Sequence, residues 1–137
     1  MTTDETRELD DRWILPLRGS VVAAVDFGET VTFVLDSGVW IVVGGGAYLS
    51  QGSIWGPDAD ARTLAQLGED VILRCVGRRV LSAVGFKSGA LRVVFSNGWH
   101  LNVGSQPKGL PSEPFVPAAV VQGETALWAR VPPAAQG

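Results

Sequence analysis

Hydrophobic and polar residues alternate in two similar stretches of the chain, and the pattern is typical of β-strands. In the first stretch, the segments 20–27, 30–35 and 39–43 are rich in β-branched and aromatic residues, with turn residues between them. Runs of this length that end at glycine-containing turns favour β-hairpins over helices. The sequence therefore predicts a three-stranded antiparallel meander within residues 17–43.

The same pattern returns in residues 77–103, where we expect strands at 79–86, 90–95 and 99–103. A shift of sixty residues superimposes the hydrophobic positions and the turn glycine of "LDSGVWIVV" on those of "FSNGWHLNV". In the first strand of each copy the alignment slips by one or two residues. This internal repeat predicts two pseudo-symmetric meanders that face each other as a sandwich or a barrel-like structure.

The segment between the two copies has the pattern of one short helix. We expect this helical insert at residues 56–68, with Pro57 and Asp58 at its start and Gly68 at its end. Residues 71–76 alternate again, which predicts a strand leading into the second copy.

The remaining segments complete one domain. Residues 118–131 favour a pair of C-terminal strands, so that a single β-rich domain extends over 13–131. A chain of 137 residues is long enough to bury a core as one domain. The acidic tail 1–12 and the last residues, 132–137, are expected to be disordered or loose. The predicted fold class is mainly β.

The charge of the chain argues against nucleic acid as a partner. The net charge is −3, and of the 14 acidic and 11 basic side chains, five and two lie in residues 1–12, so that nine of each remain. A neutral body without a basic stripe offers little to a phosphate backbone.

The cysteine content and the lengths of the apolar runs indicate in which compartment the protein acts and whether it spans a membrane. Cys75 is the single cysteine and has no partner for an internal disulfide, and residues 1–12 lack the pattern of a signal peptide. No apolar run approaches the roughly 18 residues of a membrane helix. We therefore expect a cytoplasmic protein with no membrane partner.

Strand parity singles out the first copy as unusual, because side chains alternate between the two faces of a strand. In the second copy, one face is apolar and the other carries the polar residues Arg92, His100 and Asn102. In the first copy the corresponding face is also apolar, since it carries Val34, Trp40 and Val42. Either the helix or the C-terminal segment with Trp128 covers this face, or a second subunit or partner protein does.

The five tryptophans point to candidate binding residues. Trp99 and Trp128 are expected in the core. Trp40 and Trp55 are the best candidates for a binding surface, together with Val34 and Val42, because tryptophan dominates interface hot spots. The leading hypothesis is a non-catalytic protein-binding module that engages itself, as a homodimer, or another protein.

Two other functions stay open. A small apolar ligand could occupy a cavity between the sheets lined by Phe33, Phe95 and Trp99. A hydrolase-type enzyme would use His100 with a carboxylate, although an alternating strand places a polar residue at that position in any case. Cys75 lies in an apolar run and is expected to be an inert buried thiol. The sequence predicts no catalytic residue, no metal site and no cofactor.

The residues also carry a family resemblance. The segments "LRGSVVAAV", "VGRRVLSAVGFKSGALRVVFSNGWHLNV" and "GETALWA" resemble a family of small actinobacterial proteins described as a domain of unknown function. The resemblance covers Leu17 to Trp128 and includes the pattern G-x-L-x-V-x-F-x-x-G at Gly89 to Gly98. The chain departs from it in the proline-rich segment 107–117. The resemblance implies no activity, but such proteins are similar in character to immunity proteins that neutralise a toxin.

Overall fold

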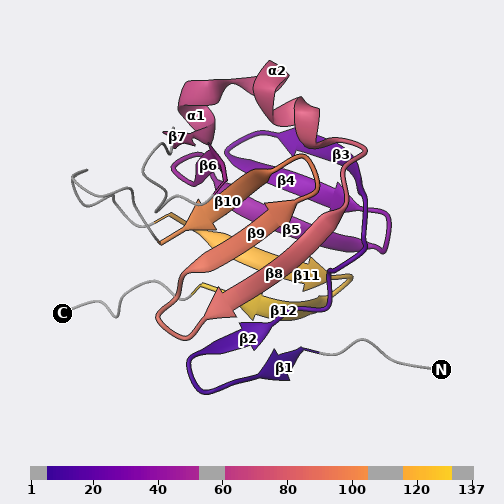
Figure 1. The fold of residues 1–137 in the computed structure, drawn as a ribbon, viewed down its shortest axis with the longest axis vertical. Coiled ribbons are helices and arrows are strands. Elements are labelled where there is room, and N and C mark those ends of the chain that lie inside the picture. The colour runs from indigo at the N-terminus through magenta and orange to yellow at the C-terminus, as the bar shows by residue number, and fades with distance from the viewer. Residues whose placement is uncertain (1–5, 53–60, 105–115, 131–137) are drawn as a thin grey trace.

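Two antiparallel β-sheets pack face to face (Figure 1). The structure, a computed structural model, describes residues 6–52, 61–104 and 116–130. The five-stranded sheet has the order β12-β11-β5-β4-β3, and the seven-stranded sheet has the order β1-β2-β8-β9-β10-β6-β7. Within these residues neither sheet closes into a barrel, so the sandwich form of the predicted mainly β fold is the correct one.

Each copy of the repeat forms three neighbouring strands of one sheet. The first copy contributes β3 (Val22–Phe27), β4 (Thr30–Leu35) and β5 (Val39–Gly44) to the five-stranded sheet. The second copy contributes β8 (Val80–Phe86), β9 (Leu91–Phe95) and β10 (Trp99–Val103) to the seven-stranded sheet. The two predicted meanders are confirmed, with strand ends within two residues of the expected ones.

One hairpin loop explains the slip in the repeat. Val22 pairs with Leu35 in the first copy and Val80 pairs with Phe95 in the second, so the first strands correspond at 58 residues and the second strands at 60. The loop between β8 and β9 is longer than the loop between β3 and β4 by these two residues. In both copies the strand register shifts just after the first of these pairs, which shows that the irregularity itself is repeated.

The two copies meet where their first strands begin. There Val21 forms a bridge with Arg79, which is its own counterpart in the repeat. The backbone N–H groups of these two residues donate to side chains in turns that occupy equivalent positions in the two copies. The N–H of Val21 donates to Asp36 Oδ1 at 2.9 Å, and the N–H of Arg79 donates to Ser96 Oγ at 3.0 Å.

The hydrogen bonds around this bridge are reciprocal. The N–H of Gly19 donates to the carbonyl of Val80, and the N–H of Gly77 donates to the carbonyl of Val22, both at 2.8 Å. Each bond is the image of the other when the two copies are exchanged. This is the relation that a two-fold axis produces between identical surfaces. The repeat therefore has a pseudo-two-fold axis that passes close to the bridge.

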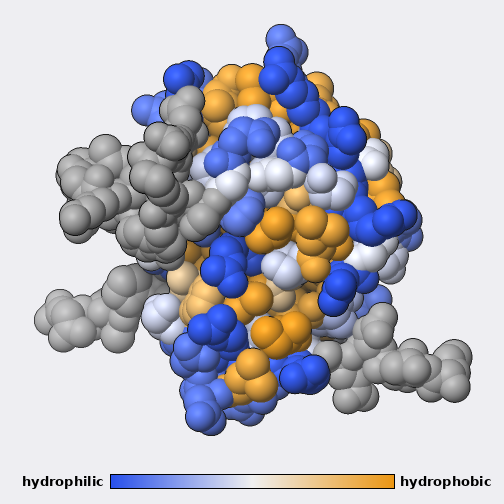
Figure 2. Space-filling model, viewed as in Figure 1, coloured by the Kyte–Doolittle hydropathy of each residue, from blue (hydrophilic) through white to orange (hydrophobic). Residues whose placement is uncertain are grey.

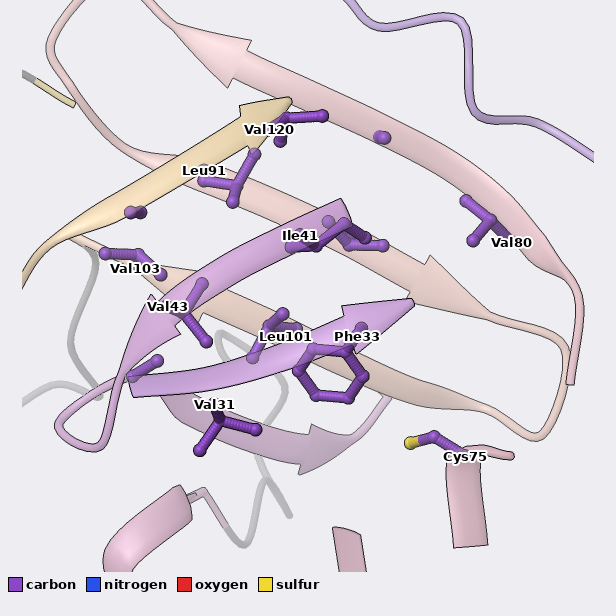
Figure 3. Packing of buried hydrophobic residues seen from close by; sticks show 14 of the residues in the cluster. Val31, Phe33, Ile41, Val43, Cys75, Val80, Leu91, Leu101, Val103 and Val120 are labelled. Carbon is purple, nitrogen blue, oxygen red and sulfur yellow. The ribbon is translucent and has the colours of Figure 1, made fainter. Parts of the chain in front are cut away.

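The core lies between the sheets and consists of the inward-facing residues of both copies. Phe33 and Phe95 are fully buried, with ring centroids 5.7 Å apart. In Figure 3, the side chains of Phe33, Ile41 and Val43 from the five-stranded sheet lie in the same buried layer as those of Leu91 and Leu101 from the seven-stranded sheet. Trp99 is only partly buried at the margin of this core, so it contributes less to the core than predicted.

The C-terminal strands extend the five-stranded sheet and bring in a buried tryptophan. Strand β11 (Ala118–Gln122) pairs with β5, and β12 (Thr125–Ala129) pairs with β11. Trp128 on β12 is 7% exposed, as expected for a core residue. Its indole ring lies directly over Gly85 of the opposite sheet, where an added Cβ would be 2.5 Å from the ring atoms Cδ1 and Nε1.

The segment between the copies contains short helices but differs from the prediction in extent. Its elements are β7 (Arg62–Thr63), α1 (Leu64–Leu67), α2 (Glu69–Ile72) and the 3₁₀ turn η1 (Leu73–Cys75). Thr63 starts α1 because its hydroxyl accepts from the N–H of Gln66, whose side chain accepts from the N–H of Thr63. Pro57 and Asp58, the expected start of the helix, lie outside the described residues.

The predicted strand at 71–76 is wrong. Residues Ile72 and Cys75 are the buried positions of this segment, and a spacing of three residues suits a helical turn. The short alternating run is compatible with a strand and with a helix, and the packing of these two side chains in the core favours the helical turns.

Strands on both sides of the second copy complete the seven-stranded sheet and were not predicted. On one side, β2 (Arg12–Ile14) pairs with β8 and β1 (Arg7–Glu8) pairs with β2. On the other side, β6 (Tyr48–Gln51) pairs with β10 and β7 pairs with β6. The expected loose tail 1–12 is therefore wrong for the part that includes β1. Lys87 holds this part in place, with Nζ 2.6 Å from Glu8 Oε2 and 5.3 Å from the ring centroid of Trp13.

Replacing Gly85 with alanine should destabilise the protein, because the new methyl group collides with the buried ring of Trp128. We expect Gly85→Ala to lower the free energy of unfolding by about 1 to 3 kcal/mol, measured by urea denaturation. Gly28→Ala is the matched control, since the nearest atom to its Cβ is 3.8 Å away. Equal stability of the two variants would contradict the placement of Trp128.

Candidate functional site

The outer face of the five-stranded sheet carries an uninterrupted apolar row. Trp40 on the central strand β5 is 49% exposed and is the most exposed large hydrophobic residue of the described chain. Strand pairing places five residues side by side across the whole sheet, in the order Ala24, Val34, Trp40, Val121 and Ala126. Of these, Val34 and Val121 are half-buried and the two alanines are exposed.

A second row runs beside the first. Its members, again one from each strand, are Asp26, Thr32, Val42, Ala119 and Ala129. Asp26, on the edge strand β3, is the only charged residue in the two rows. We call these two rows the Trp40 face. It lies on the side of the molecule that is turned away from the viewer in Figure 1.

The chain does not cover this face in the way the sequence suggested. Trp128, one of the expected covers, points into the core and lies over Gly85. The helices α1 and α2 lie at one end of the sandwich, where they and the turn after Phe27 line a cleft of about 280 Å³. The interpretation that the protein's own helix or Trp128 buries Trp40 is therefore wrong, and half of the Trp40 side chain is exposed.

The equivalent face of the second copy is different in character. Arg92, His100 and Asn102 occupy the positions that Thr32, Trp40 and Val42 hold in the first copy. Figure 2 views the molecule from this side and shows hydrophobic and hydrophilic residues interspersed. Asn102 is 3% exposed, and its Nδ2 has no hydrogen-bond partner among the described residues. The apolar outer face is thus a property of one copy only.

His100 lies on the central part of the other sheet, between two neighbouring strands. Its partners across the two adjacent strands are Val94 on β9 and Ser50 on β6. Burial lowers the pKa of His100 below its ordinary value, and the charge of Arg92 lowers the pKa further. No group of three or more His, Cys, Asp or Glu that could hold a metal ion occurs in the described residues.

Cys75 occupies a structural position that the repeat explains. Its carbonyl accepts from the N–H of Arg78 at 3.0 Å, as the carbonyl of Leu17 accepts from the N–H of Ser20 at the corresponding place. Cys75 and Leu17 are both fully buried, and the Cys75 sulfur points into the core (Figure 3). Burial raises the pKa of the Cys75 thiol to about 11, although a hydrogen bond with Asn97 acts in the opposite direction.

The other candidate residues are distributed over the molecule. Phe33 and Phe95 are buried next to each other between the sheets, and Trp99 lies at the margin of the core. Trp55 lies outside the described residues. The sequence did not identify Val121, Ala119 and the β12 alanines as part of the Trp40 face, because spacing along the chain does not show that β11 pairs with β5.

The comparisons with known proteins identify a family. The chain matches the family of unknown function (DUF6188) over residues 13–109, and it belongs to this family. The matched region includes both copies of the repeat and ends before β11. No curated protein and no solved structure matches the chain. Within the described residues, no helix has the length and apolar character needed to cross a membrane.

The buried Cys75 should not react with thiol reagents in the folded protein. A thiol with a pKa of about 11 is almost fully protonated near neutral pH, and its sulfur has no access to solvent. We expect no modification by a disulfide reagent such as dithionitrobenzoate at about pH 8 and stoichiometric modification after unfolding in guanidinium. Rapid labelling of the native protein would show that Cys75 is accessible.

His100 should make folding stability depend on pH. Because its pKa is lower in the folded state, the unfolded chain binds more protons below about pH 6.5, so stability is lost as the pH falls from this value towards the folded pKa. The urea midpoint of the wild type should fall between about pH 7.5 and about pH 5.5, and His100→Gln should reduce this decrease. An NMR titration that gives His100 an ordinary or raised pKa would contradict the expectation.

Proposed function

We propose that this member of the family of unknown function is a non-catalytic protein-binding module that acts through the Trp40 face. The observation that carries the proposal is the half-exposed Trp40 at the centre of an apolar row that crosses all five strands. Exposed tryptophans at the centre of an uncharged area are typical of interface hot spots.

The free energy available at this position is appreciable. A tryptophan side chain buries roughly 150 to 250 Å² when it is fully covered, so a partner that covers the exposed half of Trp40 removes about 100 Å² from water. At about 25 cal/mol per Å², this one side chain contributes about 2 to 3 kcal/mol to binding. The valines on either side add to this contribution.

The chemistry of the face indicates the kind of partner. Interface centres are depleted of charged residues, and Asp26 at the edge is the only charge in the two rows. A phosphate backbone would find no basic residue there, which favours a protein surface over a nucleic acid.

The groups that could support catalysis argue for a structural role instead. Cys75 is buried in the core, and His100 lies on the seven-stranded sheet, between a valine and a serine on the neighbouring strands. A single buried thiol is compatible with the reducing cytoplasm, where we expect the protein to act. A toxin that this protein neutralises is one form that the partner can take.

A charged residue at the centre of the Trp40 face should abolish binding. In an extract prepared after chemical cross-linking of intact cells that overproduce the chain, we expect part of the wild type to migrate as a complex larger than a monomer, because the cross-linker preserves complexes that dissociate on dilution. Trp40→Asp should migrate as a monomer, because the aspartate leaves a charge uncompensated in the interface.

Leu81→Asp is the matched control, since Leu81 is 46% exposed on β8 of the other sheet. It should leave the complex intact. The urea midpoints of both variants establish that they are folded. A complex that survives Trp40→Asp, or a wild type that is monomeric in the extract, would contradict the proposed function.

A further inference from the structure

We infer that the partner that covers the Trp40 face is a second copy of this chain, in a two-fold dimer whose axis runs along β5 between the two facing sheets. The inference rests on the proposed function and specifies the partner. It follows from the distribution of residues over the face, from its charge and from its size.

The first row is symmetric about the central strand. Starting from Trp40 on β5, the row continues with Val34 on one side and Val121 on the other. It ends with Ala24 on β3 and Ala126 on β12. The row therefore reads Ala-Val-Trp-Val-Ala in either direction, and the strand order places two strands on each side of β5.

A two-fold axis along β5 exchanges the two sides of the face. It places Val34 of one chain opposite Val121 of the other, each alanine opposite an alanine, and the two Trp40 side chains next to each other at the axis. An interface of this kind must be complementary to itself, because the same surface patch contributes both halves. Sheets that pack in this way lie about 10 Å apart, with strands aligned to within about 30°.

The charges agree with this arrangement. The exchange places Asp26 on β3 opposite Ala129 on β12 of the second chain, at the periphery of the contact. No carboxylate of the two rows faces another carboxylate, so the two faces approach without repulsion between like charges. The alternative is a two-fold axis perpendicular to the strands. It would place each strand over its own copy, β3 over β3, and would bring the two Asp26 side chains to the same edge of the dimer.

The size of the face predicts a weak dimer. Five strands about 4.8 Å apart, each contributing about five residues with a rise of about 3.4 Å, give a footprint of roughly 400 Å². Standard interfaces bury about 800 Å² on each partner. We therefore expect a dissociation constant roughly between the micromolar and the millimolar range. Because the two-fold contact uses the Trp40 face of both chains, it closes as a dimer and does not continue into a filament.

The purified full-length chain provides the test. Sedimentation equilibrium over concentrations from about 1 µM to about 1 mM should show a reversible monomer–dimer equilibrium. Trp40→Asp should weaken the dimer at least about thirtyfold, and Leu81→Asp should not change it. If the purified wild type is monomeric throughout this range while the complex in extract still depends on Trp40, the second copy is wrong and the proposed function stands. If neither complex depends on Trp40, both fail.

A charge pair tests the axis. Val34→Asp alone and Val121→Lys alone should each weaken the dimer about tenfold or more, because each places an unpaired charge against an apolar residue. The double variant should recover most of the dimer, since the introduced carboxylate of each chain then faces the introduced ammonium group of the other. A double variant that remains as monomeric as the single ones would overturn the two-fold arrangement, provided that its urea midpoint shows it to be folded.

Discussion

The reciprocal backbone hydrogen bonds around the bridge between Val21 and Arg79 are the constraint on which the sandwich depends. Val22 and Val80 begin their strands in the core and are fully buried, so that their backbone groups need partners. Each copy provides those partners for the other. Because the bonds join the starts of two strands in different sheets, they attach the two sheets to each other at this corner of the sandwich.

On this common frame the two copies have different outer faces. Their inward positions are apolar in both copies, since a gap or a polar group there would cost stability. Their outward positions are under no such restriction. There Trp40 and Val42 in one copy correspond to His100 and Asn102 in the other. The difference between the two outer faces therefore resides in residues that the core does not need.

The elements that local patterns determine could be predicted, and those that depend on distant partners could not. Turn glycines and strand parity were sufficient for both meanders and for the outward position of Trp40, but they left open whether the chain itself covers that face. Helical turns in residues 69–75 escaped prediction because a six-residue alternating run fits both a strand and a buried helix, and only the packing of Ile72 and Cys75 decides. Likewise the pairing of β11 with β5, which completes the Trp40 face, joins segments about eighty residues apart.

The bridge between Val21 and Arg79 has a consequence for the origin of the fold. A shorter chain with only one meander would expose the same donors and acceptors at the start of its first strand, and an identical chain would satisfy all of them. A homodimer of such half-length chains would therefore form the same reciprocal backbone hydrogen bonds at this point as the present single chain does. Gene duplication and fusion would turn the first into the second without a new contact, and would free each half to diverge on its outside.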